Sequence, residues 1–167
     1  DRVIETFTAT FKGDRISRSV HQLDLSDSQS AAYANFRRVV GILGSYNRGY
    51  NLGNVAVAMA ALTDDAVFEG FGLCAAAPCT GKTAIQKEVE RELADKMNTT
   101  VIRGGGGGVT GNTSTTRIEV RSDSIKAAGV ERILVAQTVE VKGNKVSLVR
   151  WVPDASDPQT ATYLKSV

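Results

Sequence analysis

The chain of 167 residues is long enough to bury a hydrophobic core and fits one domain. Its composition, 42% hydrophobic and 23% charged, is that of an ordinary soluble globular protein. No apolar run approaches the roughly 18 residues that a membrane span needs. The formal net charge of +2 is small and the basic residues are scattered. We therefore expect neither a nucleic-acid nor a membrane partner.

Cys74 and Cys79 are the only cysteines and lie in a predicted loop. This spacing suits a small disulfide, which would favour an oxidising compartment, but two reduced thiols are the alternative. A metal site is disfavoured because the single histidine, His21, is distant in sequence. The sequence starts at Asp1 without a methionine, so we expect a processed or trimmed product. Localisation stays open between exported and cytoplasmic, with export favoured if the disulfide forms.

Residues 1–27 predict a β-hairpin, because alternating segments at 3–11 and 15–23 flank a Gly13-Asp14 turn. The same pattern returns near the other end of the chain, shifted by 130 positions. The positions that are identical in this register, without a gap, are Arg2, Thr8, Lys12, Gly13, Ser17, Asp24, Ser26, Asp27, Gln29, Ala31 and Tyr33 against Arg132, Thr138, Lys142, Gly143, Ser147, Asp154, Ser156, Asp157, Gln159, Ala161 and Tyr163. These identities predict an internal repeat, in which the chain opens with the last hairpin of a preceding copy of its own domain.

Two interpretations of this hairpin remain open. The chain is a piece of a longer tandem protein, or the spare hairpin pairs with a sheet edge in its own or a neighbouring subunit. A two-stranded ribbon is marginally stable alone, and an unpaired edge invites another strand. We therefore expect the hairpin to dock on a sheet and to help association.

The remaining domain, residues 28–167, predicts three helices and then a run of long strands. Gly41 and Gly44 inside the first helix predict close packing against a sheet, with simple tolerance as the alternative. In the third helix, a capping box at Thr83 precedes an apolar stripe of Ile85, Val89, Leu93 and Met97. The expected helices lie at about 30–50, 52–62 and 83–97, and the expected strands at 66–71, 99–103, 109–122, 131–142 and 145–152.

Several short motifs between residues 33 and 160 carry a resemblance to a known family. They are Gly53-Asn54, Asp64-Asp65-Ala66-Val67-Phe68-Glu69, Gly81-x-x-Ala84-Ile85, Val109-Thr110-Gly111-Asn112, Ala128-Gly129-Val130-Glu131 and Gly143-x-x-Val146-Ser147. With the order of elements, they resemble the SnoaL-like branch of the nuclear transport factor 2-like superfamily. The resemblance implies an α+β fold, in which a curved antiparallel sheet wraps three helices into a cone with an apolar pocket at its wide end. It also implies a homodimer, because many members pair through the sheet.

The resemblance carries the site of ketosteroid isomerase only in part. Tyr46 falls where that enzyme has its oxyanion-hole tyrosine. Its proton-abstracting aspartate falls on Gly70, and its protonated aspartate falls near Gln137. A glycine takes no proton, and a glutamine donates a hydrogen bond without acting as an acid. The adjacent Glu69 would point to the opposite face of the strand, so steroid-type proton transfer is not expected.

The resemblance to limonene-type epoxide hydrolase is also incomplete. Arg117-Ile118-Glu119 resembles the R-x-D pair of that enzyme, and residues two apart on a strand share a face. The enzyme's second aspartate falls near Trp151, so the acid/base relay lacks a member. A surface ion pair is the alternative interpretation of Arg117 and Glu119, and we prefer it.

Three functions remain open on this basis. The first is a module of unassigned activity that binds a small, mostly apolar molecule in the cone pocket. The second is an isomerase, cyclase or epoxide hydrolase with a pocket carboxylate, and the third is an association module. Because each of these two enzymes has a catalytic aspartate that lacks a carboxylate counterpart here, we rank ligand binding above catalysis. No motif predicts a cofactor or a metal. The candidate catalytic residues are Tyr46, Glu69, Arg117 and Glu119, and the candidate ligand-binding residues are Tyr46, Tyr50, Arg117, Glu119, Gln137 and Trp151.

Overall fold

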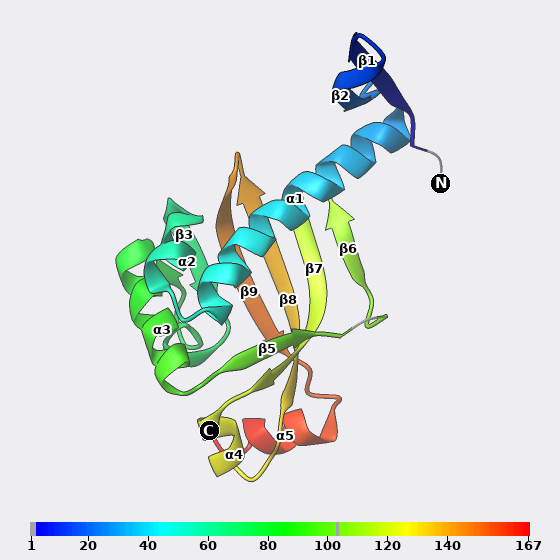
Figure 1. Ribbon diagram of the computed structural model, residues 1–167. Coiled ribbons are helices and arrows are strands. Elements are labelled where there is room, and N and C mark those ends of the chain that lie inside the picture. The colour runs from blue at the N-terminus through cyan, green and yellow to red at the C-terminus, as the bar shows by residue number, and fades with distance from the viewer. Residues whose placement is uncertain (1–2, 103) are drawn as a thin grey trace.

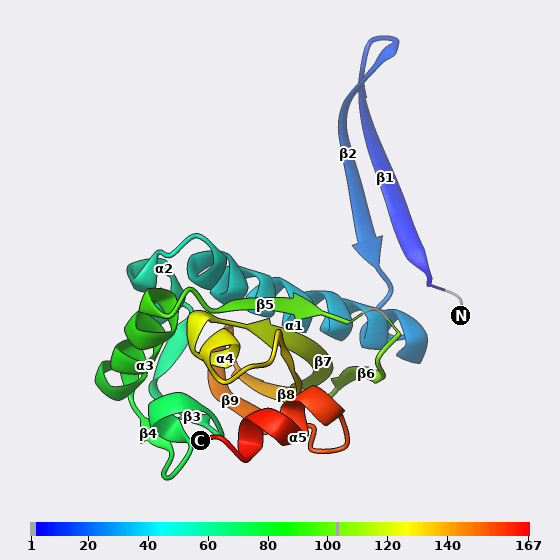
Figure 2. The same ribbon diagram turned by 90° about the horizontal axis from the view of Figure 1, so that it is seen from below.

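The computed structural model describes residues 3–102 and 104–167, and it has the expected α+β architecture (Figure 1). Helices cover one face of a curved sheet, and a separate hairpin lies beyond one end of the longest helix. The hairpin consists of β1 (Glu5–Lys12) and β2 (Arg15–Leu23), joined by a turn in which Gly13 has a φ of +67°. Figure 2 shows it projecting away from the body of the molecule. The predicted hairpin is therefore confirmed.

Two of the helices pack closely through a glycine that the sequence did not single out. α1 (Ser28–Asn51) and α2 (Val55–Ala60) approach so closely that a Cβ on Gly49 would lie 2.3 Å from the Ala58 nitrogen. A Cβ on Gly41 or Gly44 would meet no described atom within 4 Å. The prediction of close packing at these two glycines is therefore wrong, and simple tolerance of glycine at these positions is the correct interpretation.

The third helix, α3 (Lys82–Ala94), buries a stripe that differs from the expected one. Ile85 and Val89 are buried as predicted, but Glu88 and Glu92 are buried with them, whereas Leu93 is only half-buried. The buried face of α3 is therefore rotated about the helix axis relative to the predicted stripe, and it includes Glu88 and Glu92. Both carboxylates belong to the candidate site.

The main sheet has seven strands and one parallel pair. β3 (Leu62–Glu69) runs parallel to β9 (Lys145–Pro153), and the other pairings are antiparallel. The strand predicted at 109–122 is divided by a turn into two strands that pair with each other. The order is β4 (Cys79–Thr80), β3, β9, β8 (Ile133–Lys142), β7 (Thr113–Arg121) and β5 (Asn98–Val101), and β6 (Gly107–Thr110) also pairs with β7.

Three short helical segments complete the fold. They are η1 (Gly72–Cys74), α4 (Asp123–Ala127) and α5 (Pro158–Leu164). The sequence analysis missed α5, although Asp157 caps it and Tyr163 packs on Phe71 with ring centroids 6.4 Å apart. Among the described residues, no helix is both long and apolar enough to cross a membrane.

Alternation along the central strands separates an inner from an outer face of the sheet. The helices cover the inner face (Figure 1), and side chains of this face contribute to the core. Ile118, Val135, Val149 and Trp151 are among these buried residues. Neighbouring residues on the same strands therefore point outward, and this separation decides which of the candidate site residues lie together.

Candidate functional site

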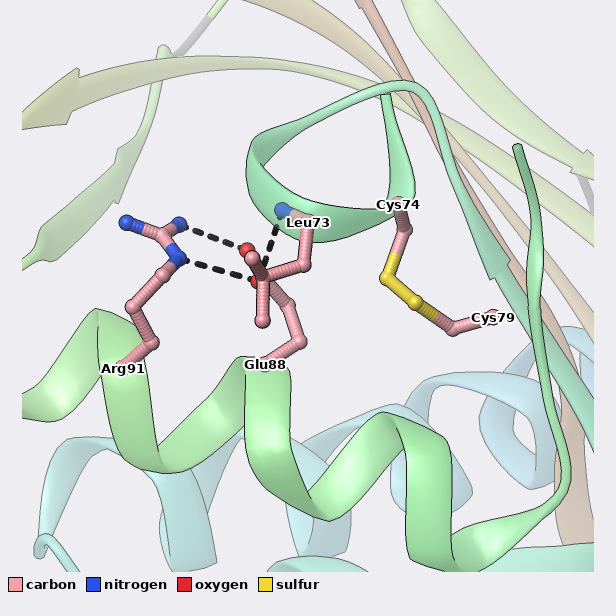
Figure 3. The surroundings of a disulfide bond; sticks show 5 residues. All are labelled: Leu73, Cys74, Cys79, Glu88 and Arg91. Atoms are coloured by element: carbon pink, nitrogen blue, oxygen red, sulfur yellow. Dashed lines mark hydrogen bonds and ion pairs between the residues drawn. A yellow bond between two sulfur atoms is a disulfide. The ribbon is translucent and has the colours of Figure 1, made fainter. Parts of the chain in front are cut away.

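Two buried glutamates of α3 form the polar centre of the core. Glu88 is completely buried and accepts hydrogen bonds from the Arg91 guanidinium at 2.6 and 2.9 Å and from the Leu73 backbone amide at 2.9 Å (Figure 3). These three donors compensate much of the cost of removing a carboxylate from water. Glu88 therefore joins α3 to the loop that contains η1.

The close approach of this loop depends on Gly72. Its φ of +58° favours glycine, and a Cβ there would lie 1.8 Å from Glu88 Oε1. Two residues further on, a disulfide joins Cys74 to Cys79 and closes the loop (Figure 3). The predicted disulfide is thus present in the structure, and it holds the segment that donates to Glu88.

Glu92 lies one turn further along α3 and lacks the donors that Glu88 has. It is completely buried, and neither carboxyl oxygen has a hydrogen-bond partner among the described residues. Burial, followed by the neighbouring Glu88 charge, raises the pKa of Glu92 to about 8. The carboxyl of Glu92 is therefore largely protonated at neutral pH.

Two tyrosines of α1 lie beside these glutamates. Burial, followed by the charge of Glu92, raises the pKa of both Tyr46 and Tyr50 above its ordinary value. The Tyr50 hydroxyl and the Trp151 Nε1 have no hydrogen-bond partner among the described residues. Three of the sequence-predicted residues, Tyr46, Tyr50 and Trp151, thus lie in the core, where the tyrosines adjoin a neutral acid.

A hollow of about 320 Å³ opens between α1 and the strands β5, β6 and β7. Its apolar lining includes Phe36 and Val40 from α1, Val101 from β5 and Val109 from β6. Phe36, Val40 and Val101 are 44%, 43% and 56% exposed, which is unusual for large apolar side chains that converge on one concavity. Ser114 and Thr116 of β7 add hydroxyl groups.

The other predicted residues face outward and are engaged in ion pairs. Arg117 pairs with Asp154, and Glu69 pairs with Arg150 at 2.6 Å. Glu119 pairs with two arginines, Arg121 at 2.7 Å and Arg132 at 3.5 Å. Arg117 and Glu119 therefore do not pair with each other, and each belongs to a different ion pair on the outer face.

Gln137 occupies an intermediate position. Its side chain accepts a long hydrogen bond of 3.4 Å from Thr116. It also borders a second hollow of about 540 Å³, which is lined largely by outward-facing residues such as Arg117, Ala136 and Val152. The structure therefore divides the predicted ligand-binding residues between the core and the other side of the sheet.

The sequence analysis missed Glu88 and Glu92. Their spacing contained the signal, because positions 85, 88, 89 and 92 recur at three- and four-residue intervals on a single helical face. An apolar stripe interrupted by two carboxylates indicates a buried polar cluster when the face packs against a core. Glutamate is rarely fully buried, so the apolar residues alone were used to place the stripe.

The arrangement of sheet and helices defines the class: this chain has the nuclear transport factor 2-like fold, as the resemblance implied. An LEH-like epoxide hydrolase from M. tuberculosis is 18% identical, with a TM-score of 0.56 over 78% of this chain and 92% of its own. SalBIII, an epoxide hydrolase/cyclase-like enzyme with a role in pyran ring formation in salinomycin, is 13% identical, with a TM-score of 0.60 over 72% and 94%.

An NTF2-like protein of unknown function from Cytophaga hutchinsonii is similar to the same degree. It is 12% identical, with a TM-score of 0.55 over 71% of this chain and 91% of its own. No family model and no curated protein matches the chain in sequence. The likeness therefore defines the fold, and the activity has to be argued from the site.

Proposed function

We propose that the chain binds a small, mostly apolar molecule in the hollow between α1 and β5–β7. The observation that carries this proposal is the convergence of exposed apolar side chains, Phe36, Val40 and Val101, on one concave surface. A volume of about 320 Å³ suits a compact ligand. The hydroxyl groups of Ser114 and Thr116 supply a few polar contacts that would orient it.

Enzymatic proton transfer has weaker support as a function. The carboxylates of Glu69 and Glu119 are held by arginines on the outer face. The raised pKa of Glu92 is typical of a catalytic acid, but Glu92 does not line the hollow. Binding without chemistry therefore explains more of the described features than an isomerase, cyclase or epoxide hydrolase activity.

Two further proposals concern the compartment and the oligomeric state of the protein. The Cys74–Cys79 disulfide favours an oxidising compartment, and we propose on that ground that the protein is exported. Association of two copies through the sheet stays a prediction from the resemblance. Neither proposal is needed for the ligand site.

The ligand site is tested by filling it. Val40→Trp places an indole in the hollow, whereas Val57→Trp alters an equally exposed valine, 44% against 43%, on α2 outside it. In a thermal-shift screen of terpenoids, steroids and polyketide-like aromatics, we expect a ligand that raises the Tm of the wild type and of Val57→Trp. Val40→Trp should lose this shift. A shift that persists in Val40→Trp, or a screen without any hit, would contradict the proposal.

A further inference from the structure

The β1–β2 hairpin repeats the geometry of the β8–β9 hairpin 130 positions later. Each residue pair across β1 and β2 has its counterpart across β8 and β9. Both ladders shift at the same point, directly after Thr10 and after Glu140. At this bulge a serine hydroxyl donates to the carbonyl oxygen of the opposite strand, from Ser17 to Thr10 at 3.0 Å and from Ser147 to Glu140 at 3.3 Å. Bulges are specific features of a fold, so this agreement extends well beyond two generic hairpins.

The bases of the two hairpins also agree. In each, a backbone amide at the base of the hairpin donates to the hydroxyl of a residue in the first turn of the following helix. This hydroxyl donates in turn to the aspartate that caps the helix. The residues are Ile4, Ser30 and Asp27 at the first site and Leu134, Thr160 and Asp157 at the second. The amide-to-hydroxyl distance is 2.8 Å and the hydroxyl-to-aspartate distance is 2.9 Å at both sites. The start of α1 therefore corresponds to α5.

The environments of the two hairpins differ. The inner face of β8–β9 is buried against the helices and includes Val139, Val141, Val146, Val149 and Trp151. The corresponding face of β1–β2 carries Phe7, Phe11 and Ile16, which are 56%, 64% and 57% exposed. The opposite face of β1 is polar, with Thr6, Thr8 and Thr10. Such one-sided patterning is that of a sheet covered on one face, and nothing in the described residues covers it here.

We propose that the Phe7–Phe11–Ile16 face docks on the body of another copy of this domain, one that precedes it in tandem. In this arrangement, the β1–β2 hairpin supplies the last two strands of the preceding copy. β2 then lies beside β3 of the preceding copy, and β1 lies beside β7 of the preceding copy. The first turns of α1 then serve as its final helix. Tyr33, 37% exposed here, takes the position of Tyr163, which is 9% exposed and packs on Phe71.

The docking face carries two polar residues at positions whose counterparts in β8–β9 are apolar and buried. Glu5 and His21 lie 3.4 Å apart at the counterparts of Val135 and Trp151. The His21 ring also contacts the Phe7 ring, with centroids 4.9 Å apart. These residues form a contiguous group, so the apolar remainder around Phe11 and Ile16 is the part of the face expected to pack most tightly.

A fusion chain tests the arrangement directly. Residues 28–130 are joined in front of Asp1 of the full chain, because Asp1 corresponds to residue 131 and this junction leaves every loop length unchanged. The added segment has no last hairpin of its own. Amide hydrogen exchange of β1 and β2 is then compared between the fusion and the original chain. We expect protection of these amides to rise at least about tenfold in the fusion, because both ribbon edges gain strand partners.

Adjacent substitutions on opposite faces provide the control. Phe11→Glu places a charge on the docking face and should abolish the added protection. Thr10→Glu puts the same side chain on the polar face, where the counterpart is Glu140, and should retain it. In the original chain neither substitution should change the Tm of the body, because both residues are exposed.

Three results would overturn the proposal. In one, the hairpin amides exchange equally fast in the fusion and in the original chain. In another, Thr10→Glu removes the added protection as completely as Phe11→Glu does. In the third, the original chain is a dimer that Phe11→Glu converts to a monomer, since a second hairpin would then cover the face instead of a domain body.

Discussion

Glu92 places an ionisable side chain inside the hydrophobic core. Its carboxyl is completely buried and has no hydrogen-bond partner among the described residues, whereas Glu88 one turn away has three donors. The carboxyl keeps its proton in the folded state because burial and the Glu88 charge disfavour its ionised form more than Arg91 and Tyr50 favour it. Its protonation therefore links folding to pH.

We predict that stability falls as the pH rises from about 5 to 8. Below its ordinary pKa of 4.5, Glu92 holds its proton in both the folded and the unfolded state. Between pH 4.5 and about 8, only the folded state holds this proton. The free energy of unfolding therefore falls as the pH rises through this range.

Substitution of Glu92 isolates this contribution. Glu92→Gln removes the titration at nearly constant shape, so between pH 5 and 8 its free energy of unfolding should fall by about 3 kcal/mol less than that of the wild type. The measurement is denaturant unfolding of both proteins at several pH values. Parallel pH profiles for the two proteins would contradict the assignment of the raised pKa to Glu92.

At the scale of elements, the loop between β3 and α3 is held by a glycine, a disulfide and a buried carboxylate together. Gly72 permits the approach, Cys74 and Cys79 close the loop, and Glu88 accepts from the Leu73 amide. The loop and the helix therefore form one unit, in which a change at either side affects the other.

Replacement of Gly72 tests this unit. Gly72→Ala places a methyl group 1.8 Å from Glu88 Oε1 and forces a positive φ on alanine, so the ion pair with Arg91 has to shift. We expect a loss of about 3 kcal/mol in unfolding free energy. The matched control, Gly53→Ala, has a similar φ of +64° but no described atom within 4 Å, and should lose only about 1 kcal/mol. Equal losses at Gly72 and Gly53 would show that the contact with Glu88 contributes nothing.

Individual elements were predictable where the pattern is local. The β1–β2 hairpin followed from its turn, and α1 from its apolar spacing. The rotation of the buried face of α3 toward Glu88 was not predictable from apolar spacing, since the packing of the η1 loop selects that face. The turn at Gly111-Asn112 separates β6 from β7. It lies within one continuous β-favouring segment, so a single strand was predicted at 109–122.

At the scale of the whole molecule, the cone-like fold was predictable and the site was not. The order of helices and strands and the motifs from Gly53 to Ser147 were sufficient for the fold. The site depends on which face of a strand is inward, and the ion pairs of Glu69, Arg117 and Glu119 hold those side chains on the outer face. A pattern that repeats every two residues gives alternation without saying which side the helices cover.

The proposed occupant of the hollow between α1 and β5–β7 is a small apolar ligand. Methyl NMR during titration with a small terpenoid tests this binding, because valines line both this hollow and the larger one on the outer side of the sheet. We predict saturable shifts of the Val40, Val101 and Val109 methyl signals, with Val57 unchanged. Shifts confined to Val152 and Ala136 in the outer hollow, or no saturable shift at all, would contradict the claim.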